Sequence, residues 1–356
     1  MEFTQSLFTF EILNFWDDKV KEEVRQFLAF NSLHYEDDVD FTALYRADGE
    51  IVATGSLSHN IIKCVAISPR FRGGNLMAKL MTRLVTMLYR RGYTHHFIFT
   101  KPRYVRSFST FGFQEVVRGE PYVAMLEHGI EENIHKYVSK LSEHKKGGKH
   151  TGAMVVDCNP VTYDHMYAIT LAASLCDWLH LFLVSEPKYF FPLEVRLELL
   201  KKSILPLKNV TIHFGGEYLV SYLTFPKYFI QKEEISHAHA LLGASLFGKY
   251  IVPSLNITHR YIRQEPDSKI DTIYNDTVKA TLPSYGVDVH EIASLTVDGH
   301  HMSAKLLRKM VYEDRWDEIG KIVTPDTYDF LRSGTDEAEL ILMRMRAGKD
   351  QIGRAS

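Results

Sequence analysis

Residues 153–165 read AMVVDCNPVTYDH, and this stretch decides the fold of the second half of the chain. Its first residues are mostly apolar, as in a strand buried inside a parallel sheet. The Asn-Pro pair after them indicates a loop. The residues from His165 onward then favour a helix. The stretch therefore predicts a strand, a loop and the start of a helix, in that order.

The same order of elements continues downstream. We expect strands over 153–158, 179–184 and 210–214, with helices over 165–176 and 191–202 between them. Strands that alternate with helices at this spacing predict a parallel sheet with right-handed crossovers. The tail after Ser333 leaves two interpretations open, a surface helix or a disordered segment.

Upstream, short apolar runs alternate with one long amphipathic stretch. Strands are expected over 41–45 and 51–56 around an Asp48-Gly49 turn, and also over 61–67 and 96–100, with a helix over 76–89. Residues 142–152 read SEHKKGGKHTG, which is typical of a linker. We therefore expect an α/β protein with domains over 1–138 and 153–345, a linker over 139–152 and a tail over 346–356.

Composition limits the classes of function. The 356 residues are 45% hydrophobic and carry a net charge of -2, so we expect neither nucleic acid nor membrane as a partner. No run approaches the roughly 18 apolar residues of a membrane helix, and no secretory signal begins the chain, so a cytoplasmic location is expected.

Cys64, Cys158 and Cys176 form no zinc or disulfide pattern and are expected in the core. His237 and His239 are expected at the surface, and no dedicated metal site is predicted.

A glycine-bearing loop in the first half connects a strand to a helix. Residues 65–76 read VAISPRFRGGNL, and a helix start binds phosphate through free N–H groups and its positive dipole end. The loop resembles the acyl-CoA pyrophosphate loop of GNAT acetyltransferases. Residues 108–113, FSTFGF, resemble the terminal helix-to-strand element of the same fold. The resemblance implies a GNAT-like N-terminal domain whose CoA-group-binding residues are Arg70, Arg72, Gly73, Gly74 and Asn75.

The loop quoted first carries a second resemblance. Thr162 and His165 match the outer positions of the His/Thr-x-Gly-His signature of adenylyl-transferring nucleotidyltransferases, and Asp164 stands in place of its glycine. Residues 302–308, MSAKLLR, are similar to the Ile-Ser-x-Ser-x-x-Arg motif of that family, with Lys305 at the second serine. The resemblance implies a Rossmann-like C-terminal domain. Its catalysis would rest on positioning and on electrostatic stabilisation of a phosphoryl transition state.

Asp164 is expected to place a negative charge where a nucleotide approaches. Two unit charges ~4 Å apart interact by ~4 kcal/mol at an effective dielectric of ~20. Three interpretations stand side by side: Lys305 offsets Asp164, both side chains are solvated, or Asp164 caps the helix beside an ordinary histidine.

Further segments at 190–196, 223–229 and 250–262 extend the resemblance over nearly the whole chain, which is similar to the citrate lyase ligase family. The resemblance implies a ligase that uses ATP, Mg²⁺ and acetate to acetylate the thiol of a CoA-like group on the citrate lyase acyl carrier protein. AMP and pyrophosphate would be released. The site residues it implies are Thr162, His165 and Arg308 for catalysis, and Asn159, Pro160, Arg196 and Ser303 for ATP binding.

Two other functions stay open from the residues alone. One is a nucleotidyltransferase that acts on another small phosphate ester, with the N-terminal domain as a separate acetyltransferase. The other is a catalytically degenerate nucleotide-binding relative, in which Asp164 and Lys305 mark lost activity.

Overall fold

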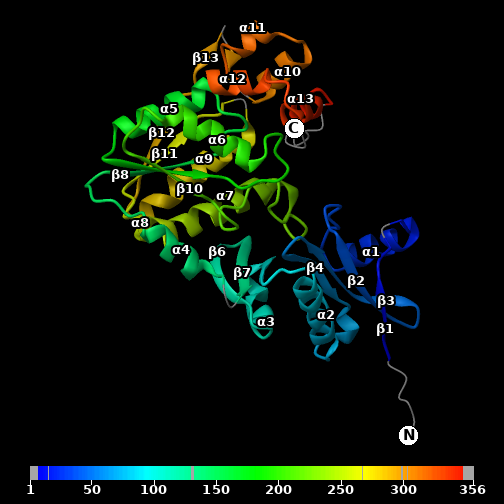
Figure 1. The fold of residues 1–356 in the computed structure, drawn as a ribbon. Coiled ribbons are helices and arrows are strands. Elements are labelled where there is room, and N and C mark those ends of the chain that lie inside the picture. Colours follow the sequence, from blue (N-terminus) through cyan, green and yellow to red (C-terminus); the bar gives the residue numbers. More distant parts are fainter. Residues whose placement is uncertain are drawn as a thin grey trace. The chain divides into compact units, whose positions relative to one another are not determined.

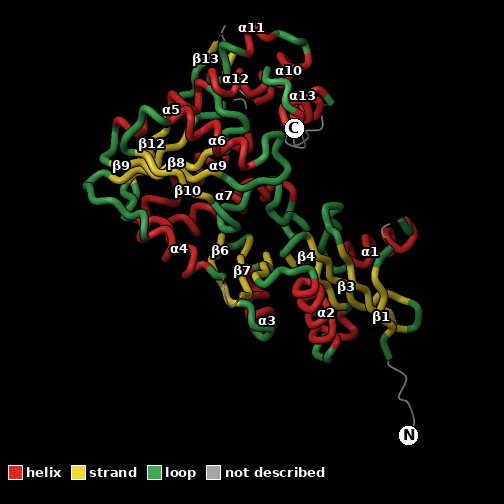
Figure 2. The backbone as a smooth tube through the Cα atoms, in the orientation of Figure 1, coloured by secondary structure: helices red, strands yellow, loops and turns green. Residues whose placement is uncertain are grey.

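The computed structural model describes residues 7–14, 16–129, 132–266, 268–297, 300–302 and 304–347. The chain divides into two compact units. The first ends at Tyr137 and is completed by Pro226–Ala238, and the second comprises Val138–Phe225 and the residues from His239 onward. Each unit contains its own large sheet, as the strands coloured yellow show (Figure 2). The two sheets give the chain the α/β class that the sequence predicted.

The first unit contains a seven-stranded mixed sheet in the order β1-β2-β3-β4-β5-β7-β6. All neighbouring strands are antiparallel except β4 and β5, which are parallel and pair only at Ile61 and Ile62. The strands are β1 (Thr9–Ile12), β2 (Phe41–Ala47), β3 (Glu50–Ser58), β4 (Ile61–Ile67), β5 (His95–Thr100), β6 (Gln114–Gly119) and β7 (Val123–Gly129). The helices are α1 (Asp18–Phe30), α2 (Leu76–Arg90) and α3 (Val105–Ser109), and α4 (Ile134–Ser142) crosses into the second unit.

Two local predictions in this unit are confirmed. Asp48 and Gly49 turn β2 into β3, and both have positive φ, the backbone conformation of a tight hairpin turn. Helix α2 buries a stripe of leucines every fourth residue, at Leu76, Leu80, Leu84 and Leu88. Burial of each leucine contributes about 1.5–3 kcal/mol.

A segment from the second half of the chain completes the first unit. Tyr228, which is buried, donates a hydrogen bond from its hydroxyl to the Phe99 carbonyl over 2.9 Å. Its own carbonyl accepts from the His34 amide over 2.7 Å, and the Lys227 amide donates to Glu36 over 2.7 Å. The segment Pro226–Ala238 is therefore a structural part of the N-terminal unit.

The second unit contains a five-stranded sheet in the order β10-β9-β8-β11-β12, in which every neighbouring pair is parallel, as predicted. The strands are β8 (Thr151–Val156), β9 (Trp178–Leu183), β10 (Val210–Phe214), β11 (His259–Arg263) and β12 (Asp288–Ile292). The helices among them are α5 (Tyr163–Ser174), α6 (Leu193–Ile204), α7 (Ile235–Leu246), α8 (Val252–Leu255) and α9 (Lys269–Thr281). Helices cover both faces of the sheet, with α5 and α6 on the face opposite α7 and α8 (Figure 1).

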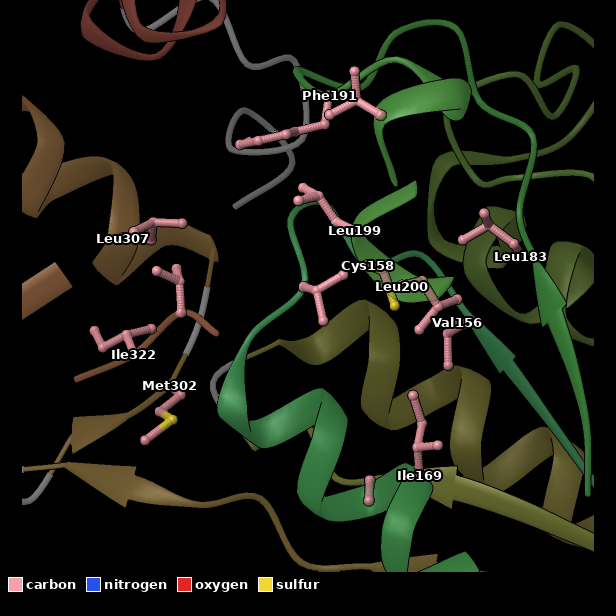
Figure 3. Packing of buried hydrophobic residues seen from close by; sticks show 14 of the residues in the cluster. Val156, Cys158, Ile169, Leu183, Phe191, Leu199, Leu200, Met302, Leu307 and Ile322 are labelled. Carbon is pink, nitrogen blue, oxygen red and sulfur yellow. The ribbon is translucent and has the colours of Figure 1, made fainter. Parts of the chain in front are cut away.

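The C-terminal helices pack beside the loop after β8. The short strands β13 (Thr296–Val297) and β14 (His300–His301) lead to α10 (Ala304–Tyr312), α11 (Trp316–Ile319), α12 (Pro325–Leu331) and α13 (Asp336–Arg346). Met302, Leu307 and Ile322 share one apolar core with Cys158 and Phe191 (Figure 3). Of the two interpretations of the tail, the helix is correct: α13 buries Ala338, Ile341, Leu342 and Met345.

Candidate active site

The candidate site lies where β8 and β11 separate. The two strands pair only at Gly152 and Ala153 of β8, and each continues beyond that pairing toward the carboxyl edge of the sheet. Because the first strand of the sheet lies at its centre, this edge is a topological switch point, where ligands bind in open α/β sheets. A cavity of about 270 Å³ lies here, and Asp157, His165 and Arg263 are among its lining residues.

Thr162 and His165 form a closed pair at the start of α5. Thr162 is the N-cap residue, and its hydroxyl oxygen accepts from the His165 amide over 3.3 Å. His165 Nδ1 lies 2.7 Å from the same hydroxyl and 3.3 Å from the Thr162 amide, so Nδ1 is the acceptor. This network assigns the imidazole proton to Nε2, which lies 3.2 Å from Asp157 Oδ1. The histidine is thus oriented from both sides.

Asp157 follows β8 directly and presents a partly exposed carboxylate to the cavity. Burial works to raise the pKa of Asp157, but the hydrogen bond with His165 and the charges of Arg263 and Arg196 lower that pKa overall. Asp157 is therefore ionised at neutral pH and holds the Nε2 proton of His165 in place.

Two of the three interpretations of Asp164 are wrong, because its side chain is not solvated and Thr162, not Asp164, caps α5. The third interpretation depends on the Lys305 side chain, which lies outside the described residues. The Asp164 side chain is fully buried and forms an ion pair with Arg263. It also accepts from the Leu295 amide over 2.5 Å and from the Ser294 hydroxyl over 3.2 Å. Asp164 does not line the cavity, and a cation from β11 and two further donors satisfy its carboxylate.

Arg263 connects this ion pair to the rest of the site. Besides Asp164 it forms an ion pair with Glu265, and its Nη2 lies 3.5 Å from His165 Nε2. Burial works to lower the pKa of Arg263, but the neighbouring carboxylates of Glu265, Asp164 and Asp157 raise it overall. Burial raises the pKa of Glu265 to about 7, with Arg263 acting in the opposite direction. The site therefore combines a permanent cation with a carboxyl group that titrates near neutral pH.

Arg196 and Asn159 lie beneath the loop that carries Asp157. The Arg196 guanidinium is buried and donates to the carbonyls of Phe191, Asp157 and Val184 over 2.7–3.0 Å. Asn159 Oδ1 accepts from the Phe191 amide over 3.1 Å, and Pro160 beside it is buried. These contacts tie together the chain segments that leave β8 and β9. Neither Asn159, Pro160 nor Arg196 lines the cavity.

The second predicted motif is described only in part. Arg308 is on α10, and its guanidinium carbon lies 5.8 Å from the centre of the Phe190 ring. That places it next to the segment held by Asn159. Ser303 lies outside the described residues, and so does the Lys305 side chain. The ion pair with Arg263 nevertheless shows that Asp164 has a cationic partner other than Lys305.

The glycine-bearing loop of the first unit forms its own hollow. Arg70, Arg72, Gly74 and Asn75 line a cavity of about 240 Å³ together with the start of α2. Asn75 is the N-cap residue of α2 and makes no side-chain capping bond. Gly73 has φ +84°, a conformation that favours glycine. The first-turn amides of α2 are therefore not capped by the Asn75 side chain.

Sequence reasoning missed several residues that line the cavity of the second unit, among them Asp157 and Glu265 as well as Arg260, Arg263 and His239. Arg260 and Arg263 belong to β11, and His239, expected at the surface, lines the cavity and lies 2.7 Å from the Val220 carbonyl. A signal for the arginines was present, since buried parallel strands rarely contain charged residues. Cys64 and Cys158 are buried as expected, whereas Cys176 is only partly buried against the core. Burial raises the pKa of Cys64 to about 12 and that of Cys176 to about 11.

Comparison with known proteins places these observations in a family. Residues 151–331 match the citrate lyase ligase C-terminal domain family. The [citrate [pro-3S]-lyase] ligase of Klebsiella pneumoniae is 32% identical over 88% of this chain and 93% of its own length. The protein of the same name from Escherichia coli K12 is 33% identical over 89% of this chain and 92% of its own length.

The fold and the site define an α/β protein with an oriented histidine at the switch point of a parallel sheet. The chain belongs to the citrate lyase ligase family, whose matched curated members are named as ligases.

Solved structures similar to part of the chain include an acyl-CoA N-acyltransferase from Pseudomonas aeruginosa. It is 17% identical, with a TM-score of 0.30, over 34% of this chain and 99% of its own. A GNAT-family acetyltransferase from Staphylococcus aureus is 16% identical, with a TM-score of 0.29, over 34% of this chain and 98% of its own. Within the described part of the chain, no helix is long and apolar enough to cross a membrane.

Proposed function

We propose that the second unit makes acetyl adenylate from acetate and ATP, and that the chain then acetylates the thiol of a CoA-like group on the citrate lyase acyl carrier protein. In the first step an acetate oxygen bonds to the α-phosphorus as the bond to pyrophosphate breaks. In the second step the thiol loses its proton, its sulfur bonds to the acetyl carbon, and AMP leaves. The names of the relatives support the choice of partner.

One observation carries this proposal: an oriented Nε2–H of His165 at the start of α5, within a cavity at the carboxyl edge of the sheet. Negative charge develops on the phosphate oxygens in the transition state, and donors that are already in place stabilise it without reorganisation. The N-terminal end of α5 adds its positive dipole. Thr162 keeps the imidazole in the required tautomer.

The other predicted residues act around this histidine. Arg308, which lies against Phe190, supplies a cation for the nucleotide phosphates. Asn159, Pro160 and Arg196 set the position of the loop beneath the nucleotide through the contacts described above. Ser303 is assigned to phosphate binding on the motif alone.

The residues of the cavity also fit a magnesium ion. Among the described residues, no group of three metal-ligating side chains occurs. Mg²⁺ is usually held by one or two carboxylates together with substrate phosphates, and Asp157, Glu265 and Asp271 line the cavity. Asp157 is the carboxylate that we assign to Mg²⁺; in that role it would exchange its contact with His165 for the ion, and the Nε2–H of His165 would then donate to the phosphate. The bound ion would neutralise charge on the leaving pyrophosphate.

Isotope exchange between pyrophosphate and ATP tests the first step. We expect acetate-dependent exchange by the whole chain, reduced about 100- to 1,000-fold by His165→Ala, because one prearranged donor is lost. His290→Ala is the matched control: this histidine is exposed on β12 of the same sheet and does not line the cavity. Exchange that is equally fast without acetate would contradict the proposal.

A further inference from the structure

Arg260, the second residue of β11, is a cation inside the second unit. It is 2% exposed, and its guanidinium carbon lies 4.7 Å from the centre of the Phe247 ring. Within the described part of the chain, its Nη1 has no hydrogen-bond partner. Tyr274 is a side-chain hydrogen-bond partner that favours its charge, and among the described residues no carboxylate acts on that charge. Arg260 is therefore a buried charge without an anion of its own.

The other buried arginines of this unit show the contrast. Arg263 is paired with two carboxylates. Arg196 donates to three backbone carbonyls, although its Nη2, like Nη1 of Arg260, has no hydrogen-bond partner among the described residues. Burial lowers the pKa of Arg260, yet a guanidinium remains protonated in proteins. A buried charge without an anionic partner lowers the stability of the fold. The presence of such a charge at Arg260 therefore indicates that an anion from outside the protein is its partner.

The cavity at the switch point gives that anion a place. Arg260 pairs in register with Ala153, the last paired residue of β8, so it lies where the two strands begin to separate. It lines the same cavity as His165. Gly243 and Phe247 also line the cavity, and a Cβ placed on Gly243 would meet no atom within 4 Å. The guanidinium thus borders open space whose lining includes the apolar residues Phe247 and Val278 as well as the polar Tyr274.

We propose that this part of the cavity is the carboxylic-acid site, in which Arg260 pairs with the carboxylate of a short aliphatic acid and Phe247, Gly243 and Val278 contact its alkyl group. The inference rests on the proposed function, since the acid held here is the one adenylated beside His165. A single guanidinium beside the apolar residues Phe247 and Val278 matches one negative charge and a small alkyl group. Phosphate carries more negative charge than a carboxylate, and the free N–H groups at the start of α5 are better suited to bind it.

The first test is Arg260→Gln in the whole chain, with acetate-dependent exchange between pyrophosphate and ATP as the readout. Loss of a charge-assisted pair predicts a rise of about 10- to 100-fold in the KM for acetate, with the KM for ATP unchanged. Arg260→Lys keeps the charge without the fork geometry and should restore part of the loss. The matched control is Arg332→Gln, because Arg332 is exposed and lies 4.8 Å from the Trp316 ring.

Thermal unfolding separates this inference from the proposed function. Without ligand, Arg260→Gln should unfold at the same temperature as the unchanged chain or higher, because it removes an unpaired charge. Acetate should raise the midpoint of the unchanged chain only. If the unchanged chain shows no exchange, the adenylation proposal fails, and acetate stabilisation still tests Arg260. A higher KM for ATP with the KM for acetate unchanged would overturn the inference in favour of a phosphate site.

Gly243→Ala provides a second test that does not depend on a charge. Removing a glycine from inside α7 should stabilise the helix, while the added methyl group enters the cavity. We expect kcat/KM for propionate, relative to acetate, to fall about tenfold, a change of the size one methylene produces in a pocket. Unchanged selectivity among acids would contradict the assignment of this space to the alkyl group.

Discussion

Asp164 and Arg263 form the most thoroughly satisfied charged pair near the candidate site. The carboxylate is fully buried and accepts from Arg263, the Leu295 amide and the Ser294 hydroxyl. It therefore anchors the start of α5 to β11 and to the segment after β12. This is a structural role, and it leaves His165, the next residue along the helix, free to face the cavity.

A double-mutant cycle tests this anchoring role. Asp164→Ala leaves Arg263 with Glu265 as its ion-pair partner and leaves two donors without their acceptor, so we expect a loss of about 3 kcal/mol in the free energy of unfolding, the lower end for a broken buried pair. Together with Arg263→Ala the loss should be smaller than the sum, with a coupling energy of about 0.5–3 kcal/mol. Urea unfolding measures both quantities. Additive losses would show that the two side chains do not act as a pair.

At the scale of elements, β9 and β10 share a pair of buried histidines. His180 Nδ1 lies 2.8 Å from His213 Nε2, and the two side chains are 0% and 5% exposed. Burial lowers the pKa of His180 to about 4 and that of His213 to about 3. The folded chain therefore keeps both imidazoles neutral at a pH where the unfolded chain, with histidine pKa values near 6.5, binds protons.

Stability should fall as the pH falls because of this pair. The contribution of the neutral histidines is fully present above about pH 6.5 and is lost toward pH 4 and below. At pH 5 the loss is at most about 2 kcal/mol per histidine. We expect the thermal midpoint to drop between pH 7 and pH 5, and the drop to be smaller in the His180→Leu, His213→Leu double variant. An equal drop in both proteins would assign the pH dependence to other groups.

The elements differ in how well their sequences predict them. The expected strands over 61–67 and 210–214 match β4 and β10 at both ends, although β4 is largely buried and β10 is a mostly half-buried edge strand. No strand was predicted over His259–Arg263, since two arginines in five residues do not resemble a buried strand. Tertiary packing overrides the local pattern there, because Asp164 from a distant segment, together with the nearby Glu265, neutralises Arg263, and Arg260 borders the cavity.

At the scale of the whole molecule, the proposed reaction needs two sites. Adenylation is assigned to the cavity of the second unit, and the CoA-like group to the loop of the first unit around Gly74. A Cβ on Gly74 would meet only the Phe71 carbonyl at 3.7 Å, so a side chain there costs the free protein little. That makes Gly74 a suitable position for separating the two steps.

Gly74→Val should therefore slow acetylation of the carrier protein about tenfold or more, because the valine side chain occupies space that the ligand's phosphates approach. Acetate-dependent exchange between pyrophosphate and ATP should be unchanged. Carrier acetylation and exchange are measured on the same preparation. The matched control is Gly147→Val, at an exposed glycine with no atom within 4 Å of an added Cβ. Equal loss of both activities would reject this division of labour.

The sequence by itself determined the α/β class, the parallel sheet of the second unit and the position of Thr162 and His165 at a helix start. These features follow from periodicity and turn residues over short stretches, which report local burial. Only the tertiary structure decided the partner of Asp164, which lies 99 residues away, the burial of Arg260 and the attachment of Tyr228 to the first unit. Contacts between distant segments depend on how strands and loops pack, and no local pattern encodes that packing.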